Sequence, residues 1–447
     1  MAVDYDLAIV GNGANALELA RRAAKLKARV ALVTEPQALS QSRLQQIATQ
    51  MRKSSAGWKK DVIRGEVSFA AFLRQVLAIL APQSELEALQ ALGVDVIVGS
   101  GQFVNARTYA VGKRQLRSRT YAIVTDPPVS TRKIVGLEQS NYLTYETLFQ
   151  LDRLPESLAI VGGDVYSCTI AQSLIHLGVT VTLLCDSSHI LPDVDVEAAR
   201  LLQAKLEVDG IEIYTSTRVT AISPLETTTE KNGQGTFRQK VWAGERTFEC
   251  DLVLMPFFSA PLQLNLEAAK VKFQGEAIAV NAKAQTSNPR IYACYASADI
   301  TKILRHSLFW TLMPPAQPAI APIISKTLPQ LAHLGMTEVD ARLRYGKNLY
   351  ALRHHYDDFG FCKLLCRQNG EIVGASIVGD CAGELIETVA IAMHTKLKIH
   401  QLAQLANISS GVISTTAAKF AEQKSASDRG KLSRLAKWFT FRRDFNI

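Results

Sequence analysis

Short continuous runs of apolar residues recur along the chain, and two of them lead into a glycine turn and then into apolar positions three and four apart. Residues 7–35 read LAIVGNGANALELARRAAKLKARVALVTE, and residues 158–186 read LAIVGGDVYSCTIAQSLIHLGVTVTLLCD. A short apolar run predicts a buried strand, whereas the three-and-four spacing predicts a helix. The segments therefore predict two strand–helix–strand units of one design, which is typical of Rossmann-like nucleotide-binding domains.

The turn of the first unit has the residue sizes that a nucleotide pyrophosphate requires. Gly11 permits the tight turn, Gly13 lets the backbone approach the phosphates, and Ala16 is small enough for the helix to pack on the strand. An acid, Glu35, follows the next strand. This G-x-G-x-x-A pattern predicts a dinucleotide-binding loop. The alternative is a Rossmann-like turn that binds nothing.

Length and composition indicate a packed globular protein. The 447 residues are 47% hydrophobic and 20% charged, which favours two to four domains. The N-terminal MAVDYDLAIVG does not resemble a signal peptide, and no run of about 18 apolar residues predicts a spanning helix. Seven cysteines, an odd number spread thinly, favour a reduced cytoplasmic setting. The His354–His355 pair has no second ligand pair nearby in sequence, so no metal site is expected.

The C-terminal segment 424–447 is basic and carries seven Lys or Arg residues against two Asp. Between residues 431 and 447 basic residues are mixed with Trp and Phe, a composition that suits an anionic membrane surface from the cytoplasmic side. The alternative is a tail that docks on its own protein or on a partner subunit. Nucleic acid is not an expected partner, because no reading motif accompanies the charge.

Several segments, in the same order, resemble the FAD-dependent pyridine nucleotide-disulphide oxidoreductases, which include dihydrolipoamide dehydrogenase, mercuric reductase and glutathione reductase. The resemblance covers nearly the whole chain, and it rests on IVGNGANALELARRAAKLKARVALV, GVDVIVGSGQFV, YLTYETLFQLDRLPESLAIVGG, NPRIYACYASADIT and IVGASIVGDCAGELIETVAIA. It implies an α/β fold with an FAD-type and an NAD-type Rossmann-like domain and a C-terminal α+β dimerisation domain. It also implies a homodimer, because GELIETVAIA resembles the interface helix of the family.

The same resemblance divides the chain into five parts. They are a first part of the FAD domain (1–150), an NAD(P)-binding-like domain (151–256), a second part of the FAD domain (257–330), a dimerisation domain (331–423) and the basic aromatic tail (424–447).

FAD is the cofactor that the resemblance implies. Gly11, Gly13 and Ala16 match the pyrophosphate loop of the family, and Glu35 lies one place beyond its ribose-binding acid. Thr125 matches the threonine of an Ala-Thr-Gly motif, and Asp299 matches the aspartate that binds the ribityl chain. In relatives a helix starts beyond this aspartate and points its positive end at the flavin, where Arg305 or His306 would stabilise a reduced flavin. The alternative for these two residues is a surface pair.

The parts that carry the disulphide chemistry of the family are missing. The family has a Cys-x4-Cys pair soon after the first acidic strand end, but the first cysteine here is Cys168. Ser409 and Ser414 occupy the places of the His and Glu that form the C-terminal acid/base pair. A dithiol relay through the usual pair is therefore excluded, and the sequence assigns no catalytic residue.

The second glycine turn departs from the family pattern at two positions. Asp164 and Ser167 replace glycines that let the backbone approach a pyrophosphate. A carboxylate about 4 Å from a phosphate costs roughly 4 kcal/mol at an effective dielectric near 20, or about a thousandfold in affinity. NAD(P)H binding is therefore doubtful. The alternative is that Asp164 turns to solvent or caps the following helix.

These features predict a divergent FAD-dependent oxidoreductase that passes electrons between flavin and an unknown partner, such as a quinone or a small redox protein. The rival prediction is a non-enzymatic flavin-binding or empty scaffold that binds a membrane surface or a protein partner. The three missing parts favour the scaffold, whereas the Gly11 loop and Asp299 favour the flavoprotein.

Overall fold

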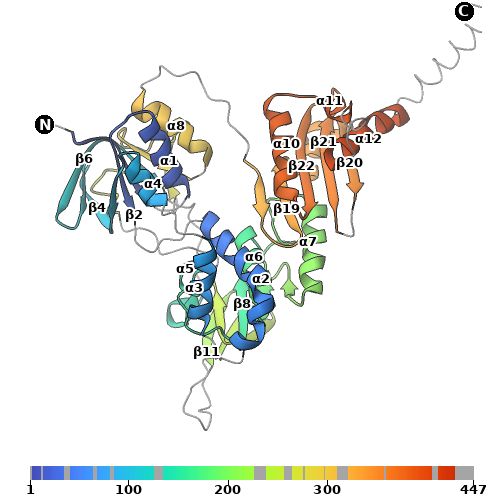
Figure 1. Ribbon diagram of the computed structural model, residues 1–447, viewed down its shortest axis with the longest axis horizontal. Coiled ribbons are helices and arrows are strands. Elements are labelled where there is room, and N and C mark those ends of the chain that lie inside the picture. The colour runs from blue at the N-terminus through green and yellow to red at the C-terminus, as the bar shows by residue number, and fades with distance from the viewer. Residues whose placement is uncertain are drawn as a thin grey trace, which may run out of the picture. The chain divides into compact units, whose positions relative to one another are not determined.

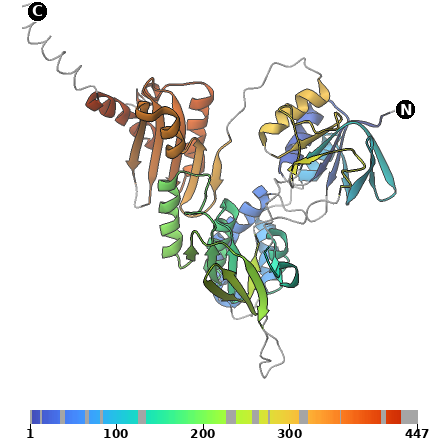
Figure 2. The same ribbon diagram turned by 180° about the vertical axis from the view of Figure 1, so that it is seen from behind.

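The computed structural model describes residues 3–11, 14–34, 41–63, 68–80, 85–124, 134–225, 238–255, 264–274, 277–295, 297–309, 321–356, 359–404 and 411–427. The chain, drawn in Figures 1 and 2, divides into two units by its internal contacts. The first unit comprises residues 1–188 and 209–319, and the second comprises residues 189–208 and 320–447.

A seven-stranded sheet forms the N-terminal part of the first unit. Its strand order is β3-β2-β1-β6-β5-β4, with β17 also paired to β6. The bounds are β1 (Tyr5–Gly11), β2 (Val30–Thr34), β3 (Asp95–Val98), β4 (Gly101–Asn105), β5 (Thr108–Val111), β6 (Arg114–Val124) and β17 (Ile291–Cys294). Strands β1, β2, β3, β6 and β17 are parallel neighbours, whereas β4, β5 and β6 pair antiparallel.

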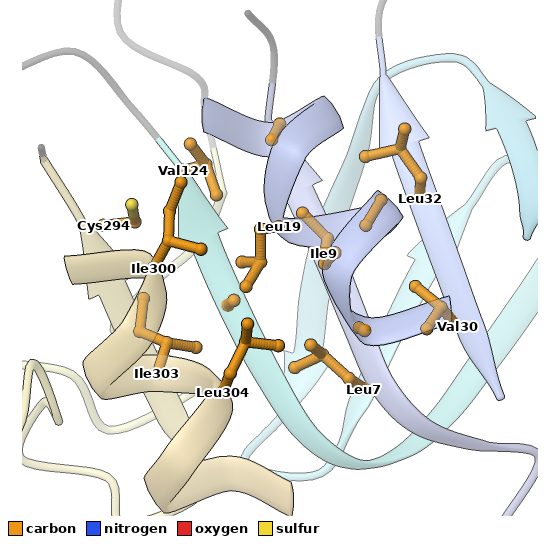
Figure 3. Packing of buried hydrophobic residues seen from close by; sticks show 14 of the residues in the cluster. Leu7, Ile9, Leu19, Val30, Leu32, Val124, Cys294, Ile300, Ile303 and Leu304 are labelled. Carbon is orange, nitrogen blue, oxygen red and sulfur yellow. The ribbon is translucent and has the colours of Figure 1, made fainter. Parts of the chain in front are cut away.

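Two helices that are distant in sequence pack on one face of this sheet. Helix α1 (Ala14–Lys25) contributes Leu19, and helix α8 (Ser297–Leu308) contributes Ile300 and Ile303, all buried with Leu7 and Ile9 of β1 (Figure 3). Helix α4 (Glu85–Ala91) adds a further buried leucine. The strand–helix–strand unit expected over 7–35 is therefore present and shares its core with the α8 segment.

A parallel five-stranded sheet forms the second Rossmann-like part of the first unit, with the order β10-β9-β8-β14-β7. Its strands are β7 (Tyr142–Leu143), β8 (Ser157–Val161), β9 (Thr180–Leu184), β10 (Glu212–Tyr214) and β14 (Leu252–Leu254). The first unit contains three further short helices, which are α3 (Phe69–Ile79), η1 (Leu137–Gln139) and α5 (Tyr145–Leu148). It also contains an antiparallel sheet of β11 (Ala221–Leu225), β12 (Arg238–Ala243) and β13 (Arg246–Cys250). A two-stranded hairpin consists of β15 (Phe273–Gln274) and β16 (Ala277–Ile278).

Helix α6 (Val165–His176) links β8 to β9, and residues 167–174 within it are all buried. Helix α2 (Gln41–Ile63) covers it, and the two lie side by side in both overall views (Figures 1 and 2). Ser173 Oγ donates to the Ala48 carbonyl at 2.6 Å, and Arg52 donates to the Gln172 side chain at 2.9 Å. The segment that would carry the redox cysteines in relatives is thus a helix packed on α6.

An antiparallel sheet with the order β18-β19-β22-β21-β20 forms the second unit. Its strands are β18 (Ile323–Ser325), β19 (Gln330–Gly335), β20 (Leu349–His355), β21 (Phe361–Arg367) and β22 (Ile372–Gly379). Helices α10 (Ala382–His394), α11 (Ile399–Gln404) and α12 (Val412–Ser427) bury one face. Helices α7 (Val196–Val208) and α9 (Glu338–Tyr345), with η2 (Gly346–Asn348) after α9, contact the same strands.

Alternation along β21 sends neighbouring side chains to opposite faces of this sheet. Cys362 and Cys366 lie in the core with α10, α11 and α12, and both are free and fully buried thiols. Lys363 has a different environment and is only 2% exposed. Its Nζ lies 2.6 Å from Asp195 and 2.7 Å from Glu197 at the start of α7.

A buried ion network therefore attaches helix α7 to this sheet. Lys363 Nζ also lies 2.9 Å from Glu338 of α9, and Arg353 pairs with both Glu197 and Glu338. Burial alone would raise the pKa of Asp195, but Lys363 outweighs it and lowers that pKa. Helix α7 follows β9 and precedes β10 in sequence, so the expected domain 151–256 is interrupted by a helix of the second unit.

No helix in the described ranges has both the length and the apolar character needed to cross a bilayer.

Candidate cofactor sites

The first glycine turn has a backbone geometry that only glycine tolerates. Gly11 ends β1 with φ +141°, and a Cβ added there would lie 1.9 Å from the Val124 carbonyl oxygen of β6. Ala16 is 1% exposed in the core beneath α1. The backbone of β1 therefore lies against β6 with no room for a side chain, and the helix packs closely on the sheet, as a pyrophosphate turn requires.

The N-terminal end of α1 carries no negative charge. No acidic residue lies in its first turn, and the sequence from Gly11 to Ala14 contains no carboxylate. The first backbone N–H groups of a helix have no partner within the helix, and the helix dipole favours an anion beside them. The residues present at this turn therefore fit the pyrophosphate of FAD.

Asp299 lies in the first turn of α8, which packs on the same sheet as α1. Its carboxylate accepts the Tyr295 N–H at 3.3 Å and pairs with Lys302 at 2.8 Å. Arg305 and His306 lie in the last turn of α8, because the helix begins at Ser297, before Asp299. The expectation that these two residues mark the positive end of a helix is therefore wrong, since they lie at its C-terminal end.

The other predicted positions of the flavin site, Gly13, Glu35 and Thr125, lie outside the described residues. Ser409, expected at the place of the acid/base pair, and the tail 431–447 lie outside them too. Ser414 is described on α12, where its hydroxyl donates to the Gly411 carbonyl at 2.8 Å.

The second glycine turn is closed by its own carboxylate. Gly162 has φ +110°, and Asp164 is the N-cap of α6. One Asp164 oxygen accepts the backbone N–H groups of Tyr166 at 2.9 Å and Ser167 at 2.7 Å. The alternative stated above for Asp164, a helix cap, is the one that the structure shows. The same carboxylate occupies donors that a phosphate would otherwise use.

Tyr145 of α5 contacts this carboxylate from the other side, and no motif in the sequence points to it. Its hydroxyl lies 3.0 Å from each Asp164 oxygen and 2.9 Å from Ser167 Oγ, while the residue is 1% exposed. Burial and the nearby Asp164 raise the pKa of Tyr145 well above its usual value, so the hydroxyl stays a donor. Burial also raises the pKa of Asp164, against hydrogen bonds from Ser167 and Tyr145 that lower it.

The two thiols nearest this turn have no reactive character. Cys168 and Cys185 are fully buried and free. Burial raises the pKa of Cys168 well above the ordinary thiol range, and it raises the pKa of Cys185 to about 12. A nucleophilic or redox-active cysteine needs an accessible thiolate, so neither thiol replaces the missing disulphide.

No group of three or more His, Cys, Asp or Glu residues suited to a metal ion occurs in the described part of the chain.

Comparison with known proteins agrees with this architecture. The model of the pyridine nucleotide-disulphide oxidoreductase family matches residues 5–317, and the model of its dimerisation domain matches residues 321–409. Dihydrolipoyl dehydrogenase from Bacillus subtilis (strain 168) is 30% identical over 332 residues, which cover 68% of this chain and 70% of that protein. NAD(P)H dehydrogenase (quinone) from Mycobacterium tuberculosis (strain ATCC 25618 / H37Rv) is 24% identical over 404 residues, which cover 80% of this chain and 78% of that protein.

A solved structure shares the fold. It is the Cu(II) complex of the HOCl-induced flavoprotein disulfide reductase RclA from Escherichia coli, with a TM-score of 0.74 and 22% identity over 90% of this chain and 95% of that chain. The predicted α/β fold with two Rossmann-like sheets and a C-terminal dimerisation domain is confirmed. The chain therefore belongs to the pyridine nucleotide-disulphide oxidoreductase family, whose members are FAD-dependent flavoproteins.

Proposed function

We propose that this chain is an FAD-dependent oxidoreductase whose flavin exchanges electrons with a partner other than a disulphide. The observation that carries the proposal is the contrast at the first turn. Gly11 and the acid-free start of α1 keep the form of a pyrophosphate site, while no cysteine precedes Cys168. The cofactor-binding framework is thus retained without the relay that its relatives use.

In this proposal the residues predicted from the sequence hold FAD. Gly11, Gly13 and Ala16 form the pyrophosphate loop, and Glu35 binds the adenosine ribose. Thr125 and Asp299 complete the site, with Asp299 on the ribityl chain. The placement of Asp299 on α8, which shares a core with α1, supports this assignment.

A quinone or a small redox protein is the partner class that fits best. Flavin, when bound, supplies transfer of one or two electrons, and a quinone takes two electrons and two protons to become the hydroquinone. Neither partner needs a thiol on the enzyme. The similarity to an NAD(P)H dehydrogenase (quinone) supports the quinone.

The first test is the visible spectrum of the purified protein, followed by anaerobic reduction with dithionite and mixing with menadione, ubiquinone-1 or cytochrome c. We expect flavin bands that bleach with dithionite and return with one of these acceptors, but not with oxidised lipoamide or glutathione. Absence of flavin bands, also after incubation with FAD, would leave the scaffold alternative. Reoxidation by the disulphides alone would contradict the proposed partner class.

The domain arrangement and the homodimer belong to the same proposal. The parts 1–150 and 257–330 form the FAD domain, 151–256 supplies the NAD-type sheet, and 331–423 forms the subunit interface. The match of a dimerisation-domain model to residues 321–409 supports the dimer. Light scattering of the purified protein should give twice the mass of 49.0 kDa, and a monomer at micromolar concentration would contradict it.

We also propose that the tail 431–447 attaches this cytoplasmic protein to an anionic membrane surface, where a quinone would be at hand. The mixture of basic and aromatic residues supports this role. Flotation with vesicles of phosphatidylglycerol and phosphatidylcholine should carry the full chain, and deletion of 430–447 should abolish this. Equal flotation of both proteins would end the idea.

A further inference from the structure

The N-terminus of α6 is the place where the family fold would receive the pyrophosphate of a nicotinamide nucleotide. A phosphate there needs free backbone N–H groups and no competing negative charge. The chain supplies neither, because one Asp164 oxygen lies 2.9 Å from the Tyr166 nitrogen and 2.7 Å from the Ser167 nitrogen. The residues present therefore do not fit the phosphate of NAD(P)H.

The carboxylate is not free to turn away from these donors. Tyr145 approaches it from α5 with a hydroxyl 3.0 Å from both Asp164 oxygens. Ser167 is fully buried, and its Oγ lies 2.9 Å from the same hydroxyl. Tyr145 is itself 1% exposed. Two backbone donors and a buried phenol thus fix the carboxylate at the helix end.

We infer that the second Rossmann-like unit does not take NAD(P)H, because Asp164, held by Tyr145, permanently occupies the anion position of the turn. Asp164 acts as a specificity-determining residue that excludes the dinucleotide, and Tyr145 stabilises the same carboxylate as a third donor. The electron donor of the enzyme is then a compound other than NAD(P)H. Binding of an oxidised nucleotide to this unit needs no flavin, so the inference stands apart from the proposed function.

The test is calorimetric titration of NAD+ and NADP+ into protein saturated with FAD, at about pH 8, where an ordinary carboxyl group is ionised. For the wild type we expect no saturable binding at millimolar nucleotide. For Asp164→Gly we expect affinity at least a hundredfold higher, since removal of a charge about 4 Å from a phosphate is worth up to about a thousandfold. Glycine is also an accepted N-cap, so this variant should retain α6.

Asp164→Asn removes the charge but keeps a side chain at the N-terminus of α6. This variant replaces Asp164→Gly in the test if the glycine variant does not fold. Asparagine caps a helix as well as aspartate does but carries no charge, so we expect a gain smaller than that of Asp164→Gly and still measurable. The matched control is Asp251→Asn. Asp251 accepts the Ser157 N–H at 2.8 Å at the opposite end of β8, so its loss should not create binding.

Two results would overturn the inference. One is saturable binding of NAD+ or NADP+ to the wild type at millimolar nucleotide or below. The other is a folded Asp164→Gly protein, or a folded Asp164→Asn protein if glycine is not tolerated, that binds no better than the wild type. If the protein takes up no FAD, the same titrations of the flavin-free protein give the same decision, and only the proposed function fails.

Discussion

Helices α1 and α6 follow the same kind of strand and the same kind of glycine turn, but the residues before their N-termini differ. Gly11 and Gly162 both have positive φ, at +141° and +110°. The two turns differ two positions beyond these glycines, where the first has Gly13 and the second has Asp164. The comparison shows that one side chain can take the backbone donors of a helix N-terminus that a phosphate would use, without any change of fold.

The physical reason lies in the backbone donors. The first four N–H groups of any helix need partners from outside the helix. In α6 the Asp164 carboxylate accepts two of these groups, the N–H of Tyr166 and of Ser167, and the buried hydroxyl of Tyr145 contacts the same carboxylate. The first turn of α1 contains no acid of its own, so a ligand phosphate can take this role.

Replacement of Gly13 by the aspartate found at the matching position of the second turn should have the largest effect. Gly13→Asp would give the first turn the charge of the second, and we expect FAD affinity to fall by about a thousandfold. The measurement is the ratio of flavin to protein after dilution and gel filtration. Gly13→Asn is the control of similar size without charge. Equal loss of FAD in both variants would show that size, not charge, decides.

Removal of the Tyr145 hydroxyl, which donates to Asp164, should have the next largest effect. Tyr145→Phe deletes a buried donor to a carboxylate, so we expect the free energy of unfolding to fall by roughly 1–3 kcal/mol. Nucleotide binding should stay undetectable, because Asp164 keeps its two backbone donors. The control is Tyr214→Phe on β10, whose ring packs edge-on against Phe248 at 4.8 Å. A larger loss in the control, measured by urea titration, would contradict the role of Tyr145.

The hydrogen bond between Ser173 of α6 and helix α2 should have a smaller effect on stability. Ser173 is 1% exposed, and its hydroxyl donates at 2.6 Å to a carbonyl of α2. Ser173→Ala should lower the free energy of unfolding by about 1 kcal/mol, because it leaves a buried carbonyl short of a donor. Ser223→Ala on β11 of the same unit is the comparison variant. An unchanged midpoint for Ser173→Ala would argue against a stabilising contact between α2 and α6.

The pH dependence of Asp164 gives the smallest and most specific signal. Burial raises its pKa, so the folded chain binds more protons than the unfolded chain between the ordinary value of 3.8 and the raised one. Ionisation therefore costs stability, and the wild type should gain relative to Asp164→Asn as the pH falls through that window. The difference between the two melting temperatures from about pH 8 to about pH 4 tests this. A difference that is constant with pH would contradict it.

The sequence predicted local features better than long-range ones. The glycine turns and their helices depend on residues close together, so the pattern around Gly11 predicts the observed unit. The sequence left two alternatives for Asp164, and the partner that distinguishes them, Tyr145, lies 19 positions away. The docking of α7 depends on Lys363, 168 positions from Asp195, and no periodicity within α7 predicts that contact. The expectation for Arg305 is wrong because α8 begins at Ser297, before Asp299, so that Arg305 lies in the last turn of the helix.

The path of α7 limits how this protein can be divided. Its gene cannot be cut once to give two independently expressed pieces. A break near residue 320 would separate the C-terminal sheet from Asp195 and Glu197, which neutralise its buried Lys363. The N-terminal piece would carry α7 with its buried alanines and leucines uncovered, a surface prone to aggregation. Fragment studies, complementation assays and domain exchange with relatives should therefore transfer residues 189–208 together with the C-terminal part.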